Sequence, residues 1–225
     1  MPQSRSIGEI LRDAEAGRLE NIFAEEREPY ELIGAAERLF DLLDERGIDY
    51  VLVGGIAMLQ YVEGRNTRDV DLIVDPKELG SVAEIVIDNR DKDFARARFE
   101  GIQVDLLFSA NKLFKAVRER HSRDALFGGR SLKCATPQGM LLLKLFALPS
   151  LYRQGDTSRA AIYEADIAGL LAGSEADGER ALSDLGPHLL TTDIEELRKI
   201  LDQIGQRRSA FLRQSKIQNP KSEID

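Results

Sequence analysis

The sequence predicts an α+β fold of the α/β type, in which helical segments flank a strand-rich middle. Residues 1–48 carry apolar side chains at helical spacing among charges, and residues 49–109 change to short apolar runs and alternating patterns typical of strands. Helical spacing returns from Thr136 onward. With 225 residues, of which 43% are hydrophobic, the chain is long enough for one large domain, or for a catalytic domain with a smaller appendage.

The composition excludes several classes of protein. A net charge of −8 and a pI near 5.0 argue against a protein that coats nucleic acid, which needs broad basic surface, although a local basic stripe stays compatible. Cys134 is the single cysteine, so there is no disulfide framework and no cysteine-based zinc site within one chain. No apolar signal region is present, and the longest apolar run, 140–148, is too short to span a bilayer. We therefore expect a cytoplasmic protein without membrane contact.

The first elements follow from local patterns. Apolar residues recur at helical spacing within 7–11 and again within 32–43, and Gly47 is expected to end the second helix as a C-cap. Residues 50–53 are short, apolar and β-prone, and residues 68–75 alternate polar with apolar side chains. Both segments predict strands.

The later elements follow in the same way. Two strands are expected on either side of Glu100-Gly101, which is typical of a β-hairpin turn. Between these strands and residue 75, residues 76–87 are expected to form a helix that Pro76 opens. Thr136 before a proline predicts the N-cap of another helix.

The end of the chain is expected to be helical. Residues 173–178 are polar and predict a loop, which two helices follow, over 182–190 and from 193 to about 211. The resulting division is an N-terminal helical segment, a core, a C-terminal helical region and a flexible basic tail, over residues 1–34, 35–135, 136–212 and 213–225 respectively.

A diglycine pair stands between the first strand and a short helix. Gly54 and Gly55 allow the backbone to turn sharply and to approach a ligand closely. A helix N-terminus follows at once, and free N–H groups there attract phosphate. The pair alone is also what an ordinary tight turn needs.

Two acids follow on the next expected strand. Asp69 and Asp71 are two residues apart, so both carboxylates point to the same face, while Val70, Leu72 and Val74 point to the core. Like charges side by side cost stability unless a cation neutralises them. Carboxylates that face a common point suit a hard ion such as Mg²⁺, and the alternative is a merely solvated strand face.

A third acid, Asp105, lies on a later apolar strand. If that strand lies beside the Asp69–Asp71 strand, three acids are available for two-metal phosphoryl chemistry. The alternative is an ion pair with Arg96 or Arg98 on the adjacent hairpin strand.

Two charged residues are expected in apolar surroundings downstream. Lys144 is the only polar residue between 140 and 148, so its helix is expected to be buried and its ammonium to contact a carboxylate or a phosphate. The alternative is an ammonium that reaches the surface. Asp166 is expected to meet Lys144 and orient it, to assist deprotonation of an acceptor, or to form a plain salt bridge with Lys144 or Arg159.

Taken in order, these motifs resemble the nucleotidyltransferase superfamily with the DNA polymerase β-like core. The motifs are the diglycine, a short helix, Arg65-x-Thr67-x-Asp69-x-Asp71 and the later Asp105. The resemblance implies a small mixed β-sheet flanked by helices. It also implies a nucleoside triphosphate bound over Gly54 and Gly55, with Mg²⁺ or Mn²⁺ held by the three acids. Arg65 is expected to contact phosphate and Thr67 to hold the loop that presents Asp69.

A narrower resemblance is to the AbiEii/AbiGii toxin group of nucleotidyltransferases. Pro137 to Lys144 matches its Pro-to-Lys motif, and Asp166 matches its later helical aspartate. The match implies that Lys144 contacts nucleotide and that both residues serve catalysis. The chain departs from the group at Ile162-Tyr163, where a basic-acidic pair is usual.

The resemblance predicts a metal-dependent enzyme. It would move a nucleoside monophosphate from a triphosphate to a hydroxyl acceptor and release pyrophosphate. The acceptor would be RNA, such as tRNA, or a protein, as in a toxin-antitoxin toxin with an antitoxin partner. The alternatives are a small-molecule transferase of the antibiotic-modifying type and a non-catalytic nucleotide-binding module.

Overall fold

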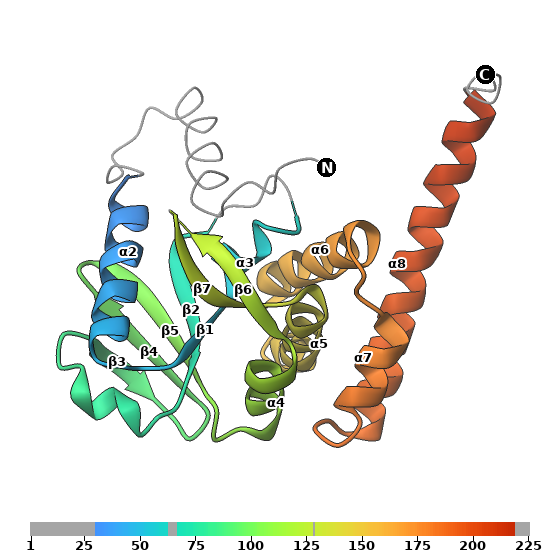
Figure 1. Ribbon diagram of the computed structural model, residues 1–225. Helices are drawn as coiled ribbons and strands as arrows, with labels where there is room; N and C mark the ends of the chain where they lie inside the picture. The colour runs from blue at the N-terminus through green and yellow to red at the C-terminus, as the bar shows by residue number, and fades with distance from the viewer. Residues whose placement is uncertain (1–29, 63–66, 128, 219–225) are drawn as a thin grey trace.

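The computed structural model describes residues 30–62, 67–127 and 129–218. Within these ranges seven strands form one mixed sheet in the order β3-β4-β5-β2-β1-β7-β6 (Figure 1). The strands are β1 (Tyr50–Val53), β2 (Asp69–Val74), β3 (Val86–Arg90), β4 (Phe94–Phe99), β5 (Ile102–Phe108), β6 (Ser122–Phe127) and β7 (Arg130–Ala135). The expected α+β class is confirmed.

The helices pack against this sheet and against one another. They are α2 (Tyr30–Glu45), α3 (Gly54–Met58), α4 (Lys112–Arg120), α5 (Pro137–Arg153), α6 (Thr157–Gly173), α7 (Gly178–Leu185) and α8 (Thr191–Gln218), with a 3-10 turn, η1, at Glu78–Ser81. Figure 1 shows α2 on one side of the molecule, α5 and α6 on the other, and α8 extending past the rest of the fold.

Aromatic and aliphatic contacts fix these helices in place. The Phe40 ring of α2 stacks on Tyr50 of β1 and meets Phe127 of β6 edge to face. Helix α5 is buried on almost every side and contacts α4, α6, α7, α8 and β7. An all-round apolar helix is stable only in such a buried position, and its side chains are therefore fixed relative to the sheet.

Several local predictions are confirmed. Gly47 has a φ of 66° after α2, as a C-cap residue requires. Glu100 and Gly101 both have positive φ, 46° and 87°, which suits the two-residue turn between antiparallel strands. The Thr136 side chain accepts a hydrogen bond from the Gly139 N–H at 3.2 Å and caps α5.

The helix predicted for residues 76–87 is wrong. Only the η1 turn is helical there, and Val86–Arg90 forms the edge strand β3, which pairs antiparallel with β4. Gly80 weakens a helix at this point, and the β-branched Val86 and Ile87 favour a strand once a neighbouring strand offers free hydrogen-bonding groups.

The C-terminal helices differ in length from the prediction. Helix α7 begins at Gly178, and α8 runs from Thr191 to Gln218, beyond the residue near 211 where the sequence pattern ends it. The helix expected within residues 7–11 lies outside the described residues. Among the helices of the described residues, none has the length and apolar character that crossing a membrane requires.

Candidate functional site

The register of the sheet places two acids and one arginine in a single row. Asp71 on β2 lies opposite Asp105 on the parallel strand β5, and Asp105 lies opposite Arg96 on β4. On its other side, Asp71 lies opposite Val53, the last residue of β1. Because residues opposite one another share a face of the sheet, the row leads from Arg96 to the turn that begins at Gly54.

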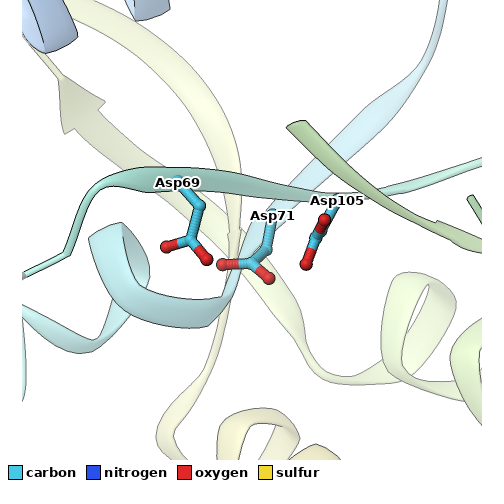
Figure 2. Close-up of side chains that lie close together, drawn as sticks. All are labelled: Asp69, Asp71 and Asp105. Carbon is cyan, nitrogen blue, oxygen red and sulfur yellow. The ribbon is translucent and has the colours of Figure 1, made fainter. Parts of the chain in front are cut away.

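Three carboxylates meet at the Asp71 end of this row. Asp69, Asp71 and Asp105 each offer an oxygen, and these oxygens lie within 4.8 Å of one another. Figure 2 shows the three side chains on the same side of the sheet, with their carboxylates next to one another. Asp69 and Asp71 are partly exposed, whereas Asp105 is 1% exposed. The convergence that the sequence predicts is present.

The diglycine turn is shaped by its close approach to Asp71. Gly54 has a φ of +62°, and a Cβ atom there would lie 1.8 Å from the Asp71 Oδ2 atom. The Gly55 N–H donates a hydrogen bond to the same oxygen at 3.2 Å. Helix α3 then buries Ile56 and Met58. The turn therefore holds the Asp71 carboxylate and leaves no room for a side chain.

The surroundings of the Asp71 carboxyl group favour a bound cation. Burial, followed by the charges of Asp69 and Asp105, raises its pKa to about 7, while the Gly55 N–H and the Lys144 ammonium act in the opposite direction. Three carboxylates at this spacing form an all-oxygen donor set that suits a hard divalent ion. The residues therefore fit Mg²⁺ or Mn²⁺.

This pKa shift predicts a pH-dependent stability. Asp71 keeps its proton up to about pH 7 in the metal-free folded protein but ionises near 3.8 when unfolded. Between these values the folded state binds more protons, so its free energy of unfolding falls as the pH rises, by at most about 4 kcal/mol. We expect Asp71→Asn to remove this slope. Urea denaturation in the presence of a metal chelator, across this pH window, measures the slope. Equal slopes in the wild type and in Asp71→Asn would contradict the raised pKa of Asp71.

The loop before β2 also supports the acids. Thr67 donates a hydrogen bond from its hydroxyl to the Asp69 Oδ1 atom at 2.8 Å, which fixes one orientation of that carboxylate. The nucleotide-binding role expected for Thr67 stays a prediction. Arg65 lies outside the described residues.

Lys144 of α5 and Asp166 of α6 form a buried ion pair. The Lys144 Nζ atom lies 2.9 Å from the Asp166 Oδ2 atom, and the two side chains are 6% and 4% exposed. The Tyr163 ring lies 3.8 Å from the same ammonium. The carboxylate partner expected for Lys144 is confirmed, and the alternative of a surface ammonium is wrong. Arg159 instead lies over the Tyr163 ring.

The buried pair predicts a large stability effect. Lys144→Met leaves the Asp166 carboxylate without its ion-pair partner in an apolar interior, and we expect a loss of about 3 kcal/mol in the free energy of unfolding. The double variant Lys144→Met/Asp166→Leu should recover part of it. Lys115→Met, which breaks an exposed pair with Glu119, is the control and should change stability by less than about 0.5 kcal/mol. If Lys144→Met and Lys115→Met lower the free energy of unfolding equally in denaturant titrations, the buried ion pair does not explain the effect.

The sequence left open whether Asp105 joins the acid cluster or pairs with an arginine, and the structure shows both. Asp105 belongs to the carboxylate cluster, and it also accepts two hydrogen bonds from Arg96, at 3.1 and 3.2 Å. Arg98 instead pairs with Asp88. The Gln103 side-chain amide donates to the Asp105 Oδ1 atom at 3.1 Å. Sequence reasoning missed Gln103, although its position two residues before Asp105 places it on the same face of a strand.

Comparison with known proteins identifies the fold. No protein-family model and no curated protein sequence matches the chain. An antigenic nucleotidyltransferase-like protein from Paracoccidioides brasiliensis superposes with a TM-score of 0.52 and 16% sequence identity, over 80% of this chain and 89% of that chain. This similarity shows that the chain has the fold of a nucleotidyltransferase-like protein.

Two further solved structures superpose less well. Both are of the antibiotic-resistance factor ANT(2'')-Ia, one in solution and one in complex with adenylyl-2''-tobramycin, and both superpose with a TM-score of 0.47. The sequence identities are 16% and 12%, over 81% and 78% of this chain and 95% and 98% of those chains, respectively.

Proposed function

We propose that this chain is a metal-dependent nucleotidyltransferase that moves a nucleoside monophosphate from a triphosphate to a hydroxyl acceptor and releases pyrophosphate. The observation that carries the proposal is the convergence of Asp69, Asp71 and Asp105 beside the Gly54-Gly55 turn. The fold shared with a nucleotidyltransferase-like protein supports it.

Each residue of the site would have a separate role in this reaction. Asp69 and Asp71 would hold the cation, and the diglycine turn would let the triphosphate approach the backbone closely. When bound there, Mg²⁺ or Mn²⁺ supplies positive charge to the triphosphate and lowers the pKa of the acceptor hydroxyl. The acceptor oxygen forms a bond to the α-phosphorus as the bond to the pyrophosphate oxygen breaks, and the hydroxyl proton is lost to water or a carboxylate.

Lys144 and Asp166 would act on the bound phosphates through charge. The Lys144 charge already lowers the pKa of Asp71, so it reaches the site electrostatically and would offset negative charge on the phosphates. Asp166 would fix the position of Lys144 through their 2.9 Å ion pair. Their place in the chain matches the Pro-to-Lys motif and helical aspartate of the AbiEii/AbiGii toxin group.

The acceptor that we propose is RNA, such as tRNA, or a protein, with an antitoxin as partner. The resemblance to the toxin group supports it, and so does the cluster of basic residues near the chain's end, from Arg198 to Lys221. The overall charge of −8 favours a protein acceptor or the second candidate, a small-molecule acceptor. RNA binding that weakens steeply with added salt supports an RNA acceptor, and salt-insensitive substrate binding opposes it.

One experiment tests the activity and the acceptor class together. The protein is incubated with each labelled nucleoside triphosphate, Mg²⁺ and a total RNA pool, and the RNA, protein and small-molecule products are separated. We expect the wild type to label one of these three fractions and the Asp71→Asn variant to label none of them. Mg²⁺-dependent nucleotide binding without pyrophosphate release across many acceptors would instead support the non-catalytic module.

A further inference from the structure

Arg96 contacts both oxygens of the most deeply buried acid in the cluster. Its Nε atom lies 3.1 Å from the Asp105 Oδ1 atom, and its Nη2 atom lies 3.2 Å from Oδ2. The Asp105 side chain is 2% exposed, whereas the Arg96 side chain is 42% exposed. With Gln103 also donating to Oδ1, the Asp105 carboxylate has partners for both oxygens before any metal ion binds.

The register of the sheet explains why Arg96, and not Arg98 of the same strand, contacts the cluster. Arg96 lies directly opposite Asp105, whereas Arg98, two residues further on the same face, lies opposite Gln103. Arg98 turns to Asp88 of β3 and makes three hydrogen bonds with its carboxylate. Strand β4 therefore places two arginines on one face but directs only one of them at the acids.

The charges indicate what Arg96 contributes. Asp69, Asp71 and Asp105 carry three negative charges when ionised, and Arg96 supplies one positive charge beside them. Its hydrogen bonds to Asp105, and then the charges of Asp105, Asp69 and Asp71, raise the pKa of its guanidinium, so it stays charged. Lys144 is already paired with Asp166. The remaining double negative charge is what one divalent ion neutralises.

We propose that Arg96 is a positioning residue that replaces a second metal ion: it serves as the fixed counter-ion of Asp105, so that the cluster holds one divalent cation, on Asp69 and Asp71. The inference rests on the proposed function for the site as a metal centre. It replaces the two-ion arrangement that three acids alone suggest. A second ion binds only when the guanidinium no longer occupies the Asp105 oxygens.

The number of bound ions tests this proposal. We would titrate the full-length chain with Mn²⁺ alone and measure free Mn²⁺ by electron paramagnetic resonance. The wild type should bind one ion and Arg96→Gln two, with the first ion bound more tightly by on the order of tenfold, because a nearby positive charge is gone. Arg96→Lys, which keeps the charge, should bind one. Arg98→Gln is the matched control and should behave as the wild type.

A second variant keeps the test decisive if Arg96→Gln does not fold. Asp105→Asn should still bind one Mn²⁺ ion, whereas Asp69→Asn and Asp71→Asn should lose it. Two ions in the wild type, one ion in folded Arg96→Gln, or complete loss of binding in Asp105→Asn overturns the role of Arg96. No Mn²⁺ binding by the wild type is a different failure, because it removes the metal centre itself.

Discussion

Asp71→Asn should lower the rate of nucleotide transfer by on the order of a thousandfold, as expected when a central group of a charge-stabilising site is removed. Asp71 lies at the middle of the site: it is opposite Asp105 in the sheet, next to Asp69 on its own strand, and bonded to the Gly55 N–H. An amide has nearly the same shape but no charge with which to hold a cation. Release of labelled pyrophosphate measures the loss.

The control for this variant is Asp75→Asn. Asp75 follows β2 directly, and its carboxylate accepts a hydrogen bond from the Lys77 N–H rather than joining the cluster. An asparagine can accept the same bond, so activity should stay within about twofold of the wild type. Addition of Mg²⁺ should raise the melting temperature of the wild type and of Asp75→Asn but not of Asp71→Asn. An Asp71→Asn protein that transfers nucleotide at the wild-type rate would falsify the proposed function.

The parts of the fold that the sequence predicts are those with local causes. The hairpin turn at Glu100-Gly101 depends on positive φ at both residues, and the start of α5 depends on the Thr136 side chain. The acids of β2 share a face because of the two-residue period of a strand. Each of these causes acts within a few residues, so a single sequence suffices to see it.

The parts that the sequence does not determine depend on contacts between distant segments. Residues 76–87 satisfy a helical pattern, yet Val86–Arg90 forms β3 because β4 offers it hydrogen-bonding partners. The choice of Arg96 over Arg98 as partner of Asp105 is likewise fixed by the pairing of β4 with β5. Tertiary pairing overrides local propensity in the first case and selects between two equivalent residues in the second.

The ion pair between Lys144 and Asp166 is predicted only in part by the sequence. The apolar surroundings of each residue show from the sequence that both need a partner. That they are partners of one another follows from the packing of α5 on α6, which no spacing reveals. The Lys144 charge lowers the pKa of Asp71, and Arg96 pairs with Asp105, so helix α5 and the sheet both shape the electrostatics of the site.

Gly54→Ala should abolish nucleotide transfer and lower the free energy of unfolding by about 3–5 kcal/mol, since it combines strained backbone with overpacking. The added Cβ would lie 1.8 Å from the Asp71 Oδ2 atom and 2.1 Å from its Cγ atom, at a residue whose φ is +62°. Either β1 or Asp71 has to move. Because the Gly55 N–H bonds to that same oxygen, the movement also separates the turn from the acids.

Two other glycines separate the clash from the backbone strain. Gly47 and Gly155 have φ values of +66° and +72°, close to that of Gly54, but an added Cβ at either would meet nothing within 4 Å. Gly47→Ala and Gly155→Ala should therefore cost only the strain of a left-handed residue, about 1 kcal/mol, and keep full activity. If all three variants lose similar stability in denaturant titrations and all remain active, the contact between Gly54 and Asp71 does not constrain the site. A selective loss in Gly54→Ala means that the diglycine turn is built around the Asp71 carboxylate.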